Sequence, residues 1–237
     1  MRYARQTARR ACVRGGTRAL ATAVALMIVA AAGCGPLKGI KVPIPLGGVD
    51  CLVVSDELEA LIEAGTDTPA ARETAYEKVR QSPCEGVGQS FGRAAVTGRV
   101  VQQKGLLAAN LVRDVEFYAR RSRDLDPGFR DFASTRMLGT LYVLAPAAFL
   151  KHGDSETGLE MLETLARDHP DVPENHLRLA EAYVSLGDIA SARPRVCQCL
   201  GMRTRLRRDD QNLLNQLFAQ LTAGGKSLGC DATEPKP

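Results

Sequence analysis

Apolar residues recur every three or four positions along most of residues 51–224. This spacing places them on one face of an α-helix, whereas a half-buried strand would require strict alternation. Gly and Pro interrupt the pattern and divide the stretch into separate helices joined by turns. The pattern therefore predicts an all-α fold built from about four successive helical hairpins and a closing helix.

Capping residues set the expected ends of these helices. Ser55 opens the first, with acidic residues in its first turn, and Gly65 ends it. The second runs over about 68–81, and residues 82–92 are predicted to form a loop. The remaining helices outside the repeats are expected over 93–103, 106–123 and 209–221.

The strongest periodic signal lies between His152 and Leu200. The pair Gly153-Asp154 recurs one period later as Gly187-Asp188. The same offset aligns three further pairs of small or apolar residues: Gly158 with Ala192, Leu162 with Val196, and Leu165 with Cys199. The offset from Asp154 to Asp188 is 34 positions. A fixed period of about 34 residues is typical of a stacked two-helix unit. One such pair cannot bury its apolar face alone, so it needs neighbours on each side.

These positions resemble the tetratricopeptide repeat (TPR) family. The matching residues of the better repeat are Leu179, Ala180 and Tyr183 in a first helix and Ala192, Val196 and Cys199 in a second. The preceding repeat matches with Leu138, Gly139, Tyr142, Gly153, Gly158, Leu162, Leu165 and Pro170, and it carries seven extra residues after Tyr142. The best repeats span 132–170 and 173–204.

The resemblance implies a short TPR-like α-solenoid of antiparallel helical hairpins with a C-terminal capping helix. Pro194 departs from a good helix, so a late helix start or a kink is expected there. First helices of TPR arrays form a concave face that binds partners. The groove residues implied here are Arg136, Thr140, Val143, Glu174, Leu177, Arg178 and Glu181. The alternative is that these residues only form solvated helix faces.

The extra segment around Pro146 to Lys151 would either lengthen one helix or form a lip beside this groove. A fully buried Phe149 would exclude the lip.

The positive charge of the chain is concentrated at its N-terminus, and this bears on which partners are expected. The chain carries a formal net charge of +4, but six arginines and no acidic residue lie within the segment 1–33. Without that segment, 25 basic residues face 27 acidic ones, so the net charge becomes −2. The basic character therefore belongs to a targeting segment, and a nucleic-acid partner is not expected.

The targeting segment ends in a motif of its own. The apolar run 19–32 is short for a membrane span. It closes in Ala31-Ala32-Gly33-Cys34, which resembles the lipobox of bacterial lipoproteins. The resemblance implies a signal peptide over 1–33 and a lipidated Cys34 on the periplasmic side of a membrane, with the outer membrane favoured. The alternatives are an ordinary secretory signal or twin-arginine export through Arg9-Arg10.

Two segments are expected to lack a packed core. Residues 34–50 are rich in Gly and Pro and are interpreted as a tether, and residues 225–237 are interpreted as a loose tail. The helical domain is therefore expected over 51–224.

An exported protein lives where disulfides persist. Cys51 and Cys84 flank the first expected hairpin, and their pairing would staple it. Cys230 could return to Cys197 or Cys199. Because Cys199 falls on a buried small position of the repeat, Cys199 is assigned as a free core thiol and Cys197 is paired with Cys230.

No pattern for catalysis stands out. The chain has no Cys-x-x-Cys motif, no Gly-rich phosphate loop and no histidine pair at metal-ligand spacing. His176 is expected to be a packed side chain. The sequence therefore favours a non-enzymatic protein without a cofactor or a metal.

The function favoured by these features is a scaffold or adaptor for protein partners in a bacterial envelope. The alternative is transport. Pro173-Glu174-Asn175-His176 and Leu179-Ala180-Glu181 are similar to the TPR-like lipoproteins associated with TRAP-type transporters, which work with a solute-binding protein. An enclosed apolar cavity would favour transport, and an open groove would favour peptide or protein binding.

Overall fold

The computed structural model describes residues 48–230, and over this range the chain is all-α, as the periodicity predicts. The expected signal peptide, the expected lipidation site Cys34, most of the expected tether and residues 231–237 of the expected tail lie outside the described residues. The α-helices are α1 (Cys51–Ala64), α2 (Pro69–Arg80), α3 (Val87–Lys104), α4 (Ala109–Leu125), α5 (Phe129–Leu144), α6 (Ser155–Asp168), α7 (Pro173–Ser185), α8 (Ile189–Gly201) and α9 (Arg208–Leu221). The short 3-10 helices are η1 (Gly105–Ala108), η2 (Ala147–Phe149) and η3 (Arg203–Arg205).

Helix α1 begins four residues before the expected start at Ser55. The carboxylate of Asp50 accepts hydrogen bonds from the backbone N–H groups of Leu52 and Val53, at 2.9 and 3.1 Å. These bonds to the charged form, that of Val53 first, lower the pKa of Asp50. Ser55 is buried inside the helix. The predicted end is confirmed, because Gly65 adopts the left-handed conformation that closes α1.

Helix α3 starts inside the segment that the sequence predicts to be a loop. Residues 87–92 are helical, and the glycines that favoured a loop serve close packing instead. A Cβ on Gly92 would collide with the backbone carbonyl of Cys51, and one on Gly88 would lie 2.8 Å from the Leu52 side chain. The loop prediction was therefore wrong from Val87 onward, because the glycines let α1 approach α3 closely.

The expected helix over 106–123 is divided. Gly105, with φ of 55°, ends α3, and η1 separates it from α4. Leu107 lies in η1 and is 89% exposed, whereas Val115 of α4 is buried.

The two predicted repeats form the packed pairs α5–α6 and α7–α8. Small residues meet where the first pair crosses: a Cβ on Gly158 would lie 2.6 Å from the carbonyl oxygen of Gly139. In the second pair Ala180, Ala192 and Val196 share one core cluster. Helix α8 starts at Ile189, capped by Asp188, and Pro194 lies inside it. Of the two alternatives expected at Pro194, a late start or a kink, the late start is therefore wrong.

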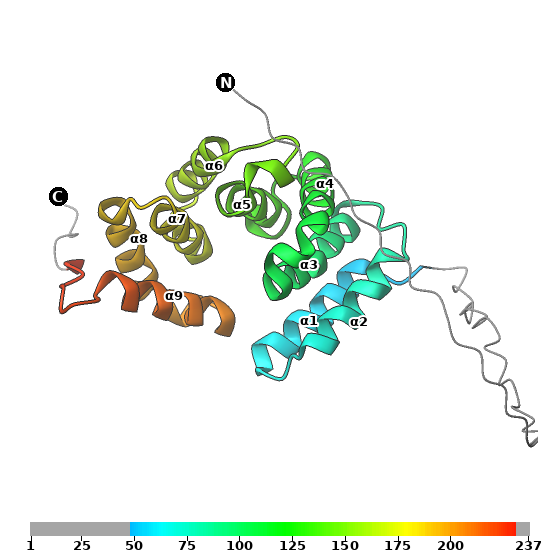
Figure 1. The fold of residues 1–237 in the computed structure, drawn as a ribbon, viewed down its shortest axis with the longest axis horizontal. Coiled ribbons are helices and arrows are strands. Elements are labelled where there is room, and N and C mark those ends of the chain that lie inside the picture. Colours follow the sequence, from blue (N-terminus) through cyan, green and yellow to red (C-terminus); the bar gives the residue numbers. More distant parts are fainter. Residues whose placement is uncertain (1–47, 231–237) are drawn as a thin grey trace, which may run out of the picture. The chain divides into compact units, whose positions relative to one another are not determined.

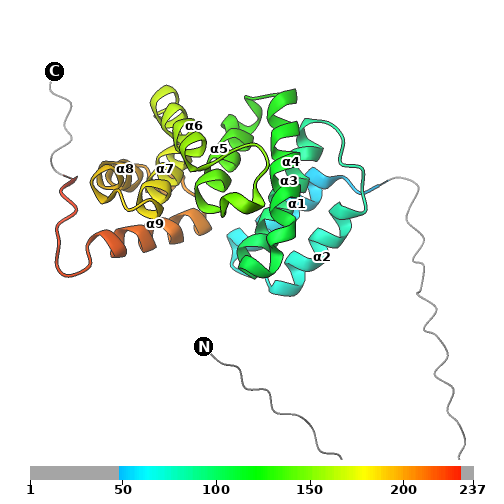
Figure 2. The same ribbon diagram turned by 45° about the horizontal axis from the view of Figure 1, so that its top comes forward.

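Helix α9 joins the last repeat to the first helices (Figures 1 and 2). Along its length it packs against α7 and α8, and Leu214, Leu217 and Leu221 enter their core cluster. Its first residues also contact α1, near the other end of the helical domain. Arg207, next to α9, donates to the carbonyl oxygen of Glu59 at 3.0 Å. The expected capping helix therefore covers an end and also closes the row of helices back onto α1.

Both expected disulfides are present. Cys51 pairs with Cys84 at a Cα–Cα distance of 5.8 Å, and Cys197 pairs with Cys230 at 5.3 Å. Cys199 is a free, fully buried thiol. Burial raises the pKa of this thiol to about 12, so it is not a nucleophile at neutral pH. None of the helices in the described part of the chain has the length and apolar character needed to cross a membrane.

Candidate functional site

The candidate site is a cavity of about 580 Å³ between the helices that begin the hairpins and the start of α9. This volume lies within the range of small-molecule sites in proteins. Residues of α1, α3, α5 and α7 line it, and the beginning of α4 and the segment around η2 complete its wall. The second helices α2, α6 and α8 contribute none of its lining residues.

One side of the cavity is apolar. Helix α3 contributes small residues to this side, and α4 and α5 contribute larger apolar ones. The apolar lining residues include Ala95, Gly98, Val101, Ala109, Val112, Met137, Leu141 and Leu144. A Cβ built on Gly98 meets nothing within 4 Å, so the backbone of α3 itself forms part of this wall.

Another part of the wall is charged. Arg99 on α3 donates to Glu59 on α1 and to Asp209 on α9, with N–O distances of 2.7 Å to each carboxylate. Arg207 lies 2.7 Å from the same Glu59 carboxylate. Burial acts to raise the pKa of Asp209, but the Arg99 guanidinium outweighs it and the net pKa is lowered. This network ties α1, α3 and α9 together at the edge of the cavity.

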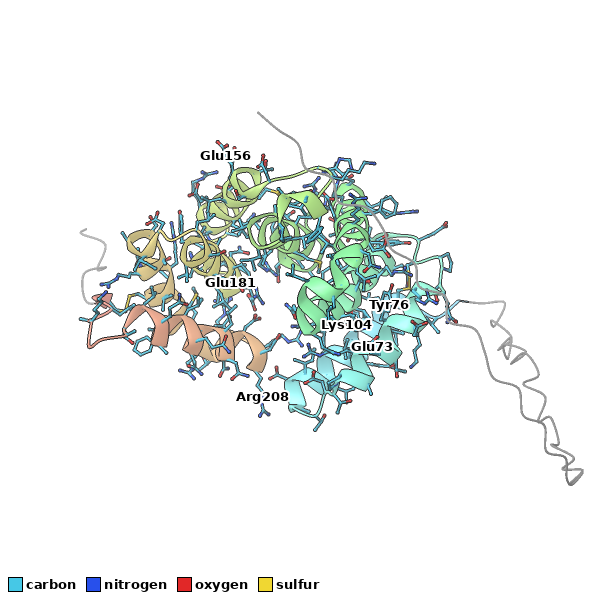
Figure 3. All side chains as sticks on the ribbon, in the orientation of Figure 1. Glu73, Tyr76, Lys104, Glu156, Glu181 and Arg208 are labelled. Carbon is cyan, nitrogen blue, oxygen red and sulfur yellow. A yellow bond between two sulfur atoms is a disulfide. The ribbon has the colours of Figure 1, made fainter. Side chains whose placement is uncertain are left out.

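A second ion cluster lies on α7 and α9. Arg178 donates to Asp210 at 2.6 Å and to Glu181 at 3.0 Å. The Asp210 side chain is only 10% exposed. Burial raises the pKa of Asp210 above its ordinary value, although Arg178 opposes the shift. In Figure 3, Glu181 lies on the inner side of α7, toward the centre of the helices.

Four of the seven groove residues implied by the TPR resemblance line the cavity. They are Arg136, Thr140, Glu174 and Arg178. Glu181 does not line it but pairs with Arg178.

The other two groove residues are corrected by the structure. Val143 and Leu177 are 8% and 0% exposed and belong to core clusters. Residues of α5 that line the cavity recur every four positions, as Arg136, Thr140 and Leu144 do. Val143 and Leu177 each lie one position before a lining residue and belong to the core instead, Val143 with residues of α6 and α7, and Leu177 with residues of α8 and α9.

The extra segment after Tyr142 forms an edge of the cavity. Pro146 and Phe149 line it, and Phe149 is only partly buried. The segment is anchored by Glu116 of α4, whose buried carboxylate accepts bonds from the backbone N–H groups of Lys151 and His152, each at 2.8 Å. The segment therefore lies as a lip beside the cavity and does not extend α5.

Sequence reasoning missed the residues of α1, α3 and α9. Glu59, Arg99, Arg207 and Asp210 all line the cavity. Arg99 and Asp209 are separated by 110 positions, and no periodicity predicts that contact. The run Arg207-Arg208-Asp209-Asp210 was the only available signal, since such a dense charge cluster opens an otherwise apolar-faced helix.

Within the described part of the chain, no histidine or cysteine is among the residues that line this cavity. The imidazole of His176 is 1% exposed and hydrogen-bonds the carbonyl oxygen of Pro170 at 2.8 Å, away from the lining residues. Burial lowers its pKa, so it is neutral at pH 7. Among the described residues, no group of three or more His, Cys, Asp or Glu side chains is arranged to hold a metal ion. What the cavity offers is an apolar wall and fixed charges, which suits binding.

In comparisons with known proteins, no protein-family model and no curated protein matches the chain.

Proposed function

We propose that this chain is a non-catalytic, TPR-like lipoprotein that is anchored by Cys34 and holds an envelope partner on the inner face of its helices. The observation that carries the proposal is the shared orientation of α1, α3, α5 and α7, whose side chains all line one cavity. First helices do this in a TPR-like solenoid. The recurrence of Gly153-Asp154 as Gly187-Asp188 and the Gly139–Gly158 crossing support the same interpretation.

The compartment part of the proposal rests on separate features. The motif ending in Cys34 supports lipidation, and two disulfides in the folded chain suit an oxidising periplasm. A triacylated cysteine would give firm anchoring, because each buried methylene contributes about 0.8 kcal/mol. We place the protein on the periplasmic side, with the outer membrane favoured.

Capture from solubilised envelope membranes tests the binding role. The full chain, expressed in its own host, would be compared with an Arg178→Gln variant at the cavity and an Arg167→Gln variant on α6. Arg167 is 68% exposed and its ion pair is with its neighbour Asp168, so it is a matched control on a helix away from the cavity. A specific protein partner should be retained by the α6 variant and depleted by the cavity variant. Equal recovery with both would reject the inner face as the binding surface.

Mass spectrometry of the processed polypeptide tests the anchor. A diacylglyceryl-modified N-terminal Cys34 is expected, and Cys34→Ser should release the protein from membranes. Recovery of an unacylated mature chain would reject the lipid anchor while leaving the helical binding face untouched.

A second candidate function is that of a TPR-like component associated with a TRAP-type transporter. The specific observation in its favour is that the cavity is bounded by helices from both ends of the helical domain, because α9 returns to α1. A half-open, partly apolar space of this size suits a small solute better than a long peptide. A soluble solute-binding protein or a permease among the captured partners would favour transport, and cell-wall or outer-membrane assembly proteins would favour the scaffold.

A further inference from the structure

Arg136 is the exception among the arginines of the cavity wall. The other four, Arg99, Arg130, Arg178 and Arg207, each lie within 2.7 Å of at least one carboxylate. Arg136 uses one guanidinium nitrogen, Nη1, for two neutral acceptors, the carbonyl oxygen of Asp131 at 2.9 Å and Oδ1 of Asn175 at 2.8 Å.

Among the described residues, no carboxylate lies within 4.0 Å of the Arg136 guanidinium. Burial lowers the pKa of Arg136, yet an arginine remains protonated at any physiological pH. The carboxylate that acts on this guanidinium most strongly is that of Glu174, which lies beyond ion-pair distance. The shielded guanidinium therefore lacks a direct partner, which is costly, and the position favours an anionic group from outside the chain.

Glu174, on the neighbouring helix α7, is the matching exception among the acids. It lines the same cavity and is partly buried, and within the described range it makes no ion pair or side-chain hydrogen bond. The other acids of the wall, Glu59 and Asp210, are both paired. The position of Glu174 in the first turn of α7 favours an acid there. The helix terminus does not supply Glu174 with a cationic side chain within ion-pair distance.

The two exceptions lie next to the apolar wall. Arg136 belongs to the same face of α5 as Leu141 and Leu144, and all of them line one continuous space with Gly98. A ligand with one negative group, one positive group and an apolar body would satisfy both unpaired charges and cover the apolar surface. A plain anion would leave Glu174 unpaired and repelled, and a plain cation would do the same to Arg136.

We propose that this cavity binds a free α-amino acid with a large apolar side chain, with its carboxylate on Arg136, its ammonium group on Glu174 and its side chain against α3 and the end of α5. Arginine suits this role because its planar fork binds a carboxylate through two parallel hydrogen bonds. The inference depends on the cavity alone. It stands whether or not the chain is lipid-anchored or holds a protein partner.

Isothermal titration of the full chain in detergent with three matched compounds tests the assignment. L-Phenylalanine carries both charges, 3-phenylpropanoate lacks the ammonium group, and 2-phenylethylamine lacks the carboxylate, while the apolar body stays the same. L-Phenylalanine should bind at least 10-fold more tightly than either analogue. An analogue that binds as tightly as L-phenylalanine would overturn the proposal, and so would the absence of binding by L-phenylalanine.

Variants locate the two ends of the ligand. Arg136→Gln should weaken L-phenylalanine binding at least 10-fold and leave 2-phenylethylamine unaffected, and Glu174→Gln should weaken it equally with 3-phenylpropanoate unaffected. Glu160→Gln on α6, a helix that contributes nothing to the cavity lining, is the matched control and should bind as wild type. Wild-type L-phenylalanine affinity in either cavity variant would contradict the assigned pairing.

Gly98→Leu provides a variant that touches neither charge. Because a Cβ at this position meets nothing within 4 Å and Gly98 lines the cavity, we expect a leucine side chain to extend into the cavity space. Its circular dichroism and melting curve should stay close to wild type while L-phenylalanine binding is lost. Wild-type affinity in a folded Gly98→Leu protein would show that the ligand binds elsewhere and would overturn the proposal.

Discussion

Asp154 and Asp188, which occupy equivalent positions in the two repeats, make the same hydrogen bond. Each carboxylate accepts from the backbone N–H three residues later, Thr157 at 2.8 Å and Ser191 at 3.1 Å. Each precedes the first residue of the second helix in its pair, α6 or α8. The hydrogen bonds to Thr157 and to Ser191 lower the pKa of the respective carboxyl groups. The recurring Asp therefore marks the start of the second helix in each pair.

This equivalence predicts equal sensitivity at the two caps. Asp154→Ala and Asp188→Ala should each lower the melting temperature, because an alanine leaves an N–H of the first turn without its acceptor. Asp154→Asn and Asp188→Asn should keep most of the stability, since the amide oxygen still accepts the bond. Thermal unfolding of the four variants is the measurement. A large loss at one site with none at the other would show that the two starts are not equivalent.

The glycines that precede these two caps, Gly153 and Gly187, are required for different physical reasons. Gly187 has φ of 81° and makes the turn between α7 and α8. Gly153 has no such conformation, and a Cβ there would collide with the ring of Tyr142. The repeat offset therefore predicts the position of both glycines correctly, but the physical reason differs between them.

Gly158 is expected to tolerate no side chain. A Cβ there would lie 2.6 Å from the Gly139 carbonyl oxygen and 2.7 Å from the Tyr142 Cβ, so α5 and α6 would have to separate. Alanine would gain up to about 1 kcal/mol from helix propensity. Overpacking costs about 1–3 kcal/mol, and the backbone contact places this site at the upper end. Gly158→Ala should therefore lower the free energy of unfolding by about 1–2 kcal/mol in urea titrations.

Gly201, at the end of α8, is the control for that substitution. A Cβ there meets nothing within 4 Å. Gly201→Ala should leave stability unchanged or slightly raised. If Gly158→Ala behaves in the same way, the two helices do not cross as closely as the structure shows.

Whether a residue of the candidate site could be predicted from the sequence depends on how far away in the sequence its partners lie. Arg136, Thr140, Glu174 and Arg178 could be predicted because they belong to repeats that are readable from local spacing. Glu59 and Arg99 could not, because they lie outside the repeats and their contacts with Arg207 and Asp209 depend on the return of α9 to α1 from the far end of the helical domain. Local pattern gives the helices and their faces, but it does not give the contact that closes the row.

Long-range ion pairs predict how stability responds to acid. The folded pKa of Asp209 is lowered below 3.8, so its contribution to stability is complete above that value and is lost as the pH falls through the folded pKa. Asp210 has a raised pKa and acts in the opposite direction. In urea titrations from pH 6 to pH 2, stability should fall below about pH 4, and Asp209→Asn should reduce the steepness of that fall. Parallel curves for wild type and variant would contradict the Arg99–Asp209 interaction.

The disulfides are expected to stabilise the two ends of the helical domain. Each bridge joins cysteines with a sequence separation of 33. Loop-closure entropy in the unfolded chain then corresponds to about 3–4 kcal/mol for each bridge. Replacing Cys51 and Cys84 together by alanine should lower the free energy of unfolding by about this amount. A loss below about 1 kcal/mol would show that α1 and α2 are held mainly by their own packing.

The buried thiol of Cys199, within the segment closed by the Cys197–Cys230 bridge, should not react until the protein unfolds. Cys199 is 0% exposed, lies 3.6 Å from the carbonyl oxygen of Pro173, and has its pKa raised to about 12. Because the thiolate is the reactive form, iodoacetamide at mildly alkaline pH should leave the Cys199 peptide unmodified in the folded protein and modify it in concentrated guanidinium, as read by mass spectrometry. Rapid labelling under native conditions would mean that α7 and α8 separate often enough to expose the centre of the repeat. Such opening would contradict a rigid inner face formed by Arg136, Glu174 and Arg178.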